Sequence, residues 1–358
     1  MAALRLLRRH LLYCPECACA QGSDVLLPTP LSRLHDLLPK REWASKHFSD
    51  DDAVPLRSCF QWLFHPDCDV LNFSPPGDAA ANMAIGVGAD GNPEYVPGYR
   101  RMWVSGSVRF IRPFYPHDIV DKSTTVVAVV EKPTRSQGNI IFVERRSLMS
   151  ARPGQAPSSS SSSSSSSLKG LAGSLTETTT HAFLPPEKNK NTVTLGSSSD
   201  SAESISFKDD PFRLPDPKSD RFPAPPVACL LTETIDNIDT SLLFKYSALT
   251  FNAHKIHYDL EHATNVEGYP GLVVHGPLLA SFLLDAYQNW CHSGKELQHN
   301  AFSGFEFRYR GKAPLFLGSK LHLVAWQRLA CNQSGVVEMA ARDDFGRTVM
   351  EASVTRIS

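Results

Sequence analysis

Two distant stretches of the chain share the same order of features, and this internal repeat limits the fold more than any other property of the sequence. Residues 105–118 begin with Ser-Gly, continue as an alternating apolar and polar segment, and then reach a proline. Residues 303–319 follow the same course. We therefore predict two copies of one α+β unit side by side, each with a helix followed by a strand meander. A chance likeness between two strand meanders is the alternative.

Length and composition agree with this arrangement. A chain of 358 residues exceeds the usual single domain, so two hydrophobic cores are expected. Hydrophobic residues make up 42% and charged residues 20% of the chain, which is typical of a globular protein. The formal net charge of −1 offers no basic excess for nucleic acid. No apolar run reaches the ~18 residues of a membrane-spanning helix.

Periodicity and turn residues divide the chain into elements. Helices are predicted over residues 28–38, 55–64, 242–250 and 277–290. Strands are predicted over 103–113, 119–130, 140–148, 175–184, 228–235, 302–308, 320–327, 336–342 and 348–357. Residues 77–98, rich in Gly and Pro, are predicted to be loop or weak helix.

These elements suggest four regions. Residues 1–24 form a leader, 25–185 an N-terminal unit, 186–226 a linker rich in Ser, Lys, Asp and Pro, and 227–358 a C-terminal unit. The N-terminal unit contains an insertion at 151–173 with an unbroken serine run, which we expect to be a disordered hairpin tip.

The leader raises two questions, one of location and one of metal binding. Arginines at 5, 8 and 9 among leucines suit a mitochondrial presequence, with a cytoplasmic location as the alternative. Cys14, Cys17 and Cys19 resemble half of a zinc site, but no second pair of ligands follows at suitable spacing. We therefore expect no metal, and an unstructured leader.

One short segment holds the side chains best suited to catalysis. Asn252, His254 and His257 lie close together in a spacing that a turn, unlike a helix, can direct toward one pocket. Histidine, with an ordinary pKa of about 6.5, is well suited to move protons near neutral pH. An asparagine amide can orient a hydroxyl group but neither gives nor takes a proton. His257 is the candidate base, with a buried structural histidine as the alternative.

A second segment supplies a candidate oxyanion site. His275 and Gly276 immediately precede an apolar helical stretch. The first N–H groups of a helix have no intrahelical partner and carry a partial positive charge, so they can stabilise a developing oxyanion. Glycine at this position lets a ligand approach the backbone closely.

Together these segments resemble a known family. Residues 251–259, Phe-Asn-Ala-His-Lys-Ile-His-Tyr-Asp, and 271–280, Gly-Leu-Val-Val-His-Gly-Pro-Leu-Leu-Ala, are similar to the MaoC-like, type 2 hydroxyacyl-thioester dehydratases. The closest likeness is to the branch of mitochondrial 3-hydroxyacyl-thioester dehydratases and mesaconyl-CoA hydratases. The resemblance implies a double hot-dog fold, in which two antiparallel sheets each wrap a central helix. It also implies that the N-terminal unit is non-catalytic.

The resemblance implies a hydro-lyase without a cofactor, acting on an acyl-CoA or acyl-carrier-protein thioester. His257, Asn252 and the Gly276 amide would be catalytic. The wider family has aspartate where this chain has Asn252, which puts its two-residue acid–base mechanism in doubt here. The leading interpretation is reversible dehydration of a 3-hydroxyacyl thioester in mitochondrial fatty-acid synthesis. Hydration of a branched or dicarboxylic enoyl-CoA, or acyl-thioester binding without catalysis, are the alternatives.

Three further residues are candidates for substrate binding. His254 and His275 flank the catalytic positions, although each also suits a structural role. Arg308 is a candidate contact for the phosphates of CoA or of phosphopantetheine, with a solvated surface position as the alternative. The oligomeric state stays open.

Overall fold

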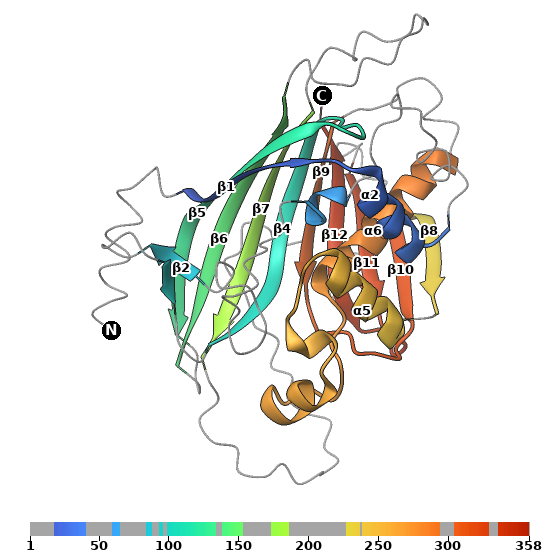
Figure 1. Ribbon diagram of the computed structural model, residues 1–358. Helices are drawn as coiled ribbons and strands as arrows, with labels where there is room; N and C mark the ends of the chain where they lie inside the picture. The colour runs from blue at the N-terminus through green and yellow to red at the C-terminus, as the bar shows by residue number, and fades with distance from the viewer. Residues whose placement is uncertain are drawn as a thin grey trace, which may run out of the picture.

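The protein is organised around one continuous antiparallel sheet of ten strands. The computed structural model describes residues 18–40, 59–64, 84–87, 93–95, 99–133, 138–152, 173–185, 227–236, 238–293, 304–328 and 336–357. The order across the sheet is β1-β5-β6-β7-β4-β9-β12-β11-β10-β8, as Figure 1 shows. Five strands come from each half of the chain, and the halves meet where β4 pairs with β9.

The strands are β1 (Ala18–Val25), β4 (Arg100–Arg112), β5 (Ile119–Pro133), β6 (Asn139–Ala151), β7 (Ser174–Leu184), β8 (Val227–Ile235), β9 (Phe305–Gly311), β10 (Leu321–Arg328), β11 (Val336–Arg342) and β12 (Thr348–Arg356). A separate hairpin is formed by β2 (Ala84–Val87) and β3 (Pro93–Tyr95). The helical elements are α2 (Pro28–Leu37), η2 (Phe60–Trp62), α5 (Thr240–Leu249), η3 (Lys255–His257), η4 (His262–Val266) and α6 (Gly276–Ser293).

The two halves repeat one strand order, which confirms the predicted double hot-dog arrangement. Counted from the two outer edges of the sheet to its centre, the order β1, β5, β6, β7, β4 in the first half matches β8, β10, β11, β12, β9 in the second. Equivalent turns contain His117 at φ 68° and Gly318 at φ 86°. The N–H of His117 donates to the Leu26 carbonyl, and the N–H of Gly318 donates to the Ile238 carbonyl. Ile238 is the residue of the second repeat that is equivalent to Leu26.

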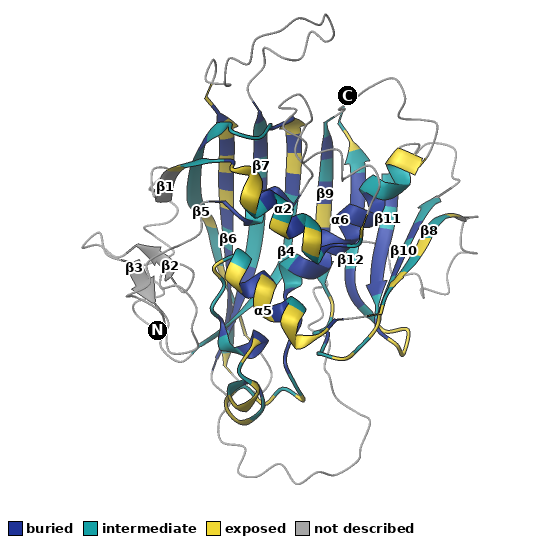
Figure 2. Cartoon of the chain, turned by 45° about the vertical axis from the view of Figure 1, so that its right-hand side comes forward, coloured by how far each residue is buried: buried dark blue, intermediate teal, exposed yellow. Residues whose placement is uncertain are grey.

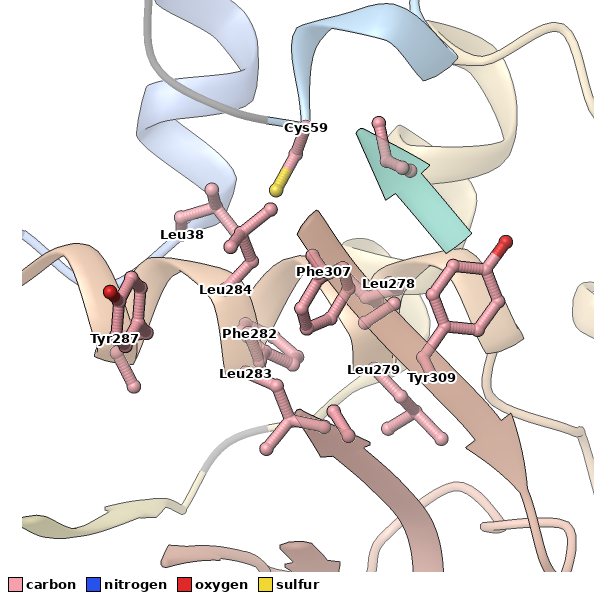
Figure 3. Packing of buried hydrophobic residues seen from close by; sticks show 14 of the residues in the cluster. Leu38, Cys59, Leu278, Leu279, Phe282, Leu283, Leu284, Tyr287, Phe307 and Tyr309 are labelled. Atoms are coloured by element: carbon pink, nitrogen blue, oxygen red, sulfur yellow. The ribbon is translucent and has the colours of Figure 1, made fainter. Parts of the chain in front are cut away.

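The C-terminal half wraps its five strands around α6. Ten consecutive residues of this helix, Leu278–Tyr287, are buried, and their side chains pack against strand residues such as Phe307 in Figure 3. Burying one such apolar side chain contributes about 1.5–3 kcal/mol, so α6 anchors this half. Within the described residues, the N-terminal half has no counterpart of α6.

A second layer lies over α6 and positions the candidate site. The short helices α2 and α5 pack against each other in front of the sheet (Figure 2). Each helix has one buried side and one exposed side (Figure 2). The buried side of α2 carries Leu31 and Leu34, and that of α5 carries Leu243 and Tyr246. Because α2 belongs to the first repeat and α5 to the second, this layer also joins the two halves.

The structure corrects three expectations. Part of the expected leader is a strand, since β1 pairs with β5 from Ala18 to Val25. The segment 77–98 contains the β2–β3 hairpin, where loop or weak helix was predicted. Of the predicted helix 55–64, the described part holds only the three-residue turn η2. Pairing partners far along the chain decide whether such short segments become strands.

Other expectations fall partly outside the described residues. These include Cys14 and Cys17, the serine run and the 186–226 linker. The strands flanking the serine run, β6 and β7, pair directly up to Ser150 and Ser174. In the second repeat the equivalent connection is a tight turn, in which the N–H of Gly346, at φ 75°, donates to the Asp343 carbonyl.

Candidate active site

The first candidate catalytic segment begins where α5 ends. Asp239 caps the start of this helix, because its carboxylate accepts a hydrogen bond from the Leu242 N–H at 2.7 Å. At the other end, Phe251 adopts φ 52°, which turns the chain sharply. The Asn252 N–H then bonds back to the Ser247 carbonyl at 2.9 Å. The chain therefore leaves α5 in a defined direction at Asn252.

Asn252 shapes the turn that follows. Its side-chain oxygen accepts a hydrogen bond from the His254 N–H at 3.2 Å, an Asx-type turn. The chain continues into η3, closed by a bond from the His257 N–H to the His254 carbonyl at 3.2 Å. The side chains of His254 and His257 are both buried, and their rings stand perpendicular with centroids 5.8 Å apart.

The second segment is bound to the first at Val273. Its N–H donates to the Ile256 carbonyl at 2.9 Å, and its carbonyl lies 2.7 Å from His257 Nδ1. A carbonyl only accepts hydrogen bonds, so Nδ1 carries a proton in this contact. In the neutral ring, Nε2 therefore holds the lone pair that a general base needs.

His275 packs directly on His257. The two rings stack at 3.6 Å with an interplanar angle of 17°. His275 is fully buried, and its Nε2 lies 2.8 Å from the Ser247 hydroxyl. Burial, followed by the positive charge that His257 and His254 can carry, lowers the pKa of His275 well below its ordinary value. His275 is therefore a neutral ring stacked against His257, the candidate base.

The candidate oxyanion donor lies at the start of α6, next to His275. Gly276 is the first residue of that helix. The indole of Trp103, from β4 of the other repeat, covers it so closely that a Cβ on Gly276 would overlap the ring. The N-terminal repeat thus supplies one wall of the site. Only glycine fits at this position, because any side chain would overlap the Trp103 ring.

Five of the six predicted site residues share this small region: Asn252, His254, His257, His275 and Gly276. Arg308 does not. Phe307 and Tyr309, its neighbours on β9, are buried on the side of α6, so alternation places Arg308 on the opposite face of the sheet. Its guanidinium lies 3.1 Å from the Glu306 carboxylate, and its side chain is 48% exposed.

Sequence reasoning missed three contributors to this site. Ser247 holds the His275 ring, the Val273 carbonyl holds the His257 ring, and Trp103 covers Gly276. Trp103 also packs against the main core. Val273 lies within the motif segment 271–280, whereas Ser247 lies in α5, just before the motif segment 251–259.

Asp259 holds the turn that follows η3. Its carboxylate accepts a hydrogen bond from the His262 N–H at 2.9 Å. Arg100 of β4 reaches the end of the following turn, where it donates to the Glu267 carbonyl at 2.9 Å. The loop after the candidate catalytic turn is therefore also held by the N-terminal repeat.

Neither a metal-binding cluster nor a membrane-spanning helix is present among the residues that the structure describes. No group of three or more His, Cys, Asp or Glu side chains there is placed to hold a metal ion. None of the helices in that part of the chain has the length and apolar character to cross a membrane.

Known structures share this fold. A MaoC-like dehydratase from Phytophthora capsici superposes with a TM-score of 0.57 at 14% identity, covering 95% of each chain. The peroxisomal multifunctional enzyme type 2 of Drosophila melanogaster superposes with a TM-score of 0.55 at 11% identity, covering 99% of this chain and 52% of that enzyme. At such identities the likeness concerns the fold alone.

Curated relatives match shorter stretches. A mesaconyl-C(4)-CoA hydratase from Chloroflexus aurantiacus is 41% identical over 130 residues, 36% of this chain and 41% of that protein. The mitochondrial hydroxyacyl-thioester dehydratase type 2 of Schizosaccharomyces pombe is 37% identical over 83 residues, 23% of this chain and 25% of that protein. The matched part spans less than half the length of either relative.

Residues 81–317, more than half of the chain, match the family model described as hydroxyacyl-thioester dehydratase type 2. This stretch includes both candidate catalytic segments and the strand that carries Trp103. The chain therefore belongs to the hydroxyacyl-thioester dehydratase type 2 family.

Proposed function

We propose that the protein catalyses the reversible dehydration of a 3-hydroxyacyl thioester to a trans-2-enoyl thioester. The single observation that carries this proposal is the pair of contacts made by His257. Its Nδ1 is held at 2.7 Å by the Val273 carbonyl, and its ring is stacked on neutral His275. These contacts fix the tautomer and the plane of a general base beside the start of α6.

In the proposed reaction, His257 Nε2 removes the α-proton of the substrate and becomes positively charged. Negative charge develops on the thioester oxygen, where the Gly276 N–H stabilises it. The bond between the β-carbon and its hydroxyl then breaks. The proton on His257 passes to the leaving hydroxyl, which departs as water, and the base is regenerated.

Asn252 is proposed to bind the departing hydroxyl through its amide NH₂ group, because its side-chain oxygen already accepts the His254 N–H. An amide does not exchange protons as a carboxylate does, so His257 performs both proton transfers. His254 and His275 are proposed to shape the wall around the substrate. We propose that residues 227–358 form the catalytic unit.

The His257→Gln variant tests the proposal. A positioned acid–base group is worth about 10²–10⁴-fold in rate, so kcat for hydration of crotonyl-CoA should fall by about that factor. His322→Gln is the matched control, since His322 is a partly exposed histidine of β10 that contacts Thr234. Near-normal turnover by His257→Gln would contradict the proposed mechanism. A wild-type protein that binds the thioester without turnover would support the non-catalytic alternative.

A second candidate substrate is a branched or dicarboxylic enoyl-CoA. It is favoured by the similarity to a mesaconyl-C(4)-CoA hydratase over 130 residues. Comparing kcat/KM for crotonyl-CoA with that for mesaconyl-CoA separates the two candidates. The same assay with acyl-carrier-protein thioesters identifies the carrier.

We also propose a mitochondrial location. The arginines at 5, 8 and 9 support it, as does the mitochondrial relative from Schizosaccharomyces pombe. Because β1 begins at Ala18, a removable leader would end before that residue, earlier than the predicted boundary at 24. Import into isolated mitochondria, with N-terminal sequencing of the imported protein, tests both points.

A further inference from the structure

Arg100, the first residue of β4, reaches from the N-terminal repeat to the loop that joins the two candidate catalytic segments. Its Nη1 donates a hydrogen bond to the Glu267 carbonyl at 2.9 Å and lies 3.5 Å from the Glu267 carboxylate. One guanidinium nitrogen therefore contacts both the backbone and the side chain of the same residue. Hydrogen bonds from a charged donor are roughly twice as strong as neutral ones. This contact ties the first repeat to the loop.

The contact lies in a largely buried setting. The Glu267 side chain is 6% exposed and that of Arg100 is 23% exposed. His262 Nε2 lies 3.7 Å from the Glu267 carboxylate, but it carries a charge only when protonated. Burial, opposed by Arg100 and aided by Glu267, raises the pKa of the Tyr269 phenol, which lies beside both groups. Because arginine stays protonated in proteins, Arg100 supplies the permanent positive charge of this cluster.

Glu267 stands where the loop reverses toward α6. Its N–H donates to the His262 carbonyl at 3.0 Å and so closes η4. Gly268 then adopts φ 74°, a left-handed conformation that glycine tolerates without strain. The Tyr269 N–H donates back to the Ala263 carbonyl at 2.9 Å. The group that holds Glu267 therefore helps to set the direction in which the chain enters the second candidate segment.

Both ends of the loop adjoin the candidate base. The loop begins at Asp259, two residues after His257, and leads into Val273. The Val273 carbonyl lies 2.7 Å from His257 Nδ1, so the ring and its acceptor sit on opposite sides of the loop. A shift of the loop can therefore change the orientation of the base. A misplacement of about 1 Å that starts far from the chemistry can cost about 10²-fold in rate.

The start of β4 thus meets the candidate site at two points. Trp103 covers Gly276 at the beginning of α6. Three residues earlier on the strand, Arg100 holds Glu267 in the loop. The first contact shapes a wall of the site, whereas the second can act only through the backbone that joins Glu267 to the catalytic segments.

We propose that Arg100 is a positioning residue for the proposed reaction. By fixing Glu267, it holds the loop 259–270 and thereby keeps His257 aligned on the Val273 carbonyl. This proposal rests on the proposed function. Arg100 contacts no reacting atom in that mechanism. It follows that the catalytic groups of the C-terminal repeat depend on the N-terminal repeat for their alignment.

The test compares Arg100→Ala with Arg109→Ala, which alters an exposed arginine further along the same strand. We expect kcat for crotonyl-CoA hydration to fall by about tenfold or more in Arg100→Ala, with KM within about twofold of the wild type, because the base is misaligned. Arg109→Ala should keep the wild-type kcat. Wild-type kcat in Arg100→Ala would overturn the proposal.

A rescue variant tests the contact itself. Both contacts to Glu267 come from Nη1, so the single ammonium of Arg100→Lys can replace either of them. We expect Arg100→Lys to recover part of the kcat that Arg100→Ala loses. A lysine variant no more active than the alanine variant would count against a role based on holding Glu267.

A double variant separates misalignment from a folding defect. Arg100→Ala alone leaves the buried Glu267 carboxylate without its permanent cation, which weakens folding. Arg100→Ala/Glu267→Gln removes both charges, so its urea midpoint should lie near that of the wild type. Its kcat should still be about tenfold low, because the hydrogen bond to the residue 267 carbonyl is missing. A stable double variant with wild-type kcat would reject the positioning role.

Hydrogen–deuterium exchange of the full-length protein separates this inference from the proposed function. Backbone amides of residues 259–276 should exchange about tenfold faster or more in Arg100→Ala than in Arg109→Ala, while those of β9 to β12 keep the wild-type rate. Such a change supports the positioning role even if the wild type hydrates no enoyl thioester. Unchanged exchange in a wild type that hydrates crotonyl-CoA would support the proposed function and reject the role of Arg100.

Discussion

The rings of His257 and His275 stack face to face at 3.6 Å, although eighteen positions separate these residues in the chain. Each ring is held by a different group: His257 by the Val273 carbonyl, and His275 by the Ser247 hydroxyl. The His275 ring stays neutral because burial opposes its protonation and lowers its pKa. His275 therefore adds no second positive charge beside His257 when His257 takes up a proton.

Ser247→Ala should weaken both folding and turnover. The variant leaves His275 Nε2 buried without its hydrogen-bond partner, at a cost of about 1–3 kcal/mol. Looser packing of His275 would also allow His257 to tilt, so we expect kcat to fall by about tenfold. Urea unfolding and crotonyl-CoA hydration measure these effects. Ser293→Ala is the control, since the Ser293 hydroxyl lies exposed at the end of α6. Wild-type behaviour in Ser247→Ala would show that the His275 contact is dispensable.

Stability should fall as the solution becomes acidic, partly because of His275. Its pKa is lowered in the folded state, so only the unfolded chain binds a proton at His275 just below pH 6.5. This group has no effect well above pH ~6.5, and below it stability falls by about 1.4 kcal/mol per pH unit. Burial also lowers the pKa of His181, which acts in the same direction. Urea unfolding at several pH values should show a shallower fall for His275→Leu than for the wild type. Equal slopes would contradict the assignment.

Asn252→Asp should retain activity. A carboxylate oxygen can accept the His254 N–H in place of the amide oxygen, so the turn is preserved. The new carboxylate can also exchange protons, so we expect kcat within about tenfold of the wild type. Asn252→Leu lacks the acceptor and should lose more activity. An inactive Asn252→Asp with normal stability would show that donation from the amide NH₂ group is required.

Gly276→Ala should damage the site by overpacking. A Cβ at this position would overlap the Trp103 ring, and forced insertion into a packed site typically costs about 1–3 kcal/mol. Turnover should fall as well, because the first turn of α6 must move. Gly271→Ala is the matched control, since a Cβ there meets no atom within 4 Å. Adding Trp103→Leu should restore part of the lost stability. No recovery in the double variant would assign the damage to another cause.

Arg308→Ala should have little effect. The side chain is 48% exposed, pairs with Glu306, and lies on the face of the sheet opposite the histidines. Exposed ion pairs contribute about 0–1 kcal/mol. We expect the KM for crotonyl-CoA to stay within about twofold of the wild type. A large rise in KM that high salt reproduces in the wild type would restore the predicted phosphate contact.

Local patterns were sufficient for much of the architecture. Alternation predicted the strands from β4 to β12, and the apolar run after Gly276 predicted α6, because these periodicities arise from residues close in sequence. The internal repeat predicted two similar units, and the strand order agrees. The expectations that failed concern short segments such as β1 and the β2–β3 hairpin. Their state depends on distant partners.

The candidate site likewise has one part that the sequence predicted and another that only the folded chain shows. The sequence alone identified five site residues, because they lie within two short segments and have side chains suited to catalysis: Asn252, His254, His257, His275 and Gly276. The stacking of His257 on His275, the cover that Trp103 gives Gly276, and the hydrogen bond from Arg100 to Glu267 required the folded chain. Contacts of this kind join residues from different strands, helices and repeats, and their geometry is set by the packing of the whole sheet around α6. For the same reason Arg308, which the sequence placed with the site, lies on the outer face of β9.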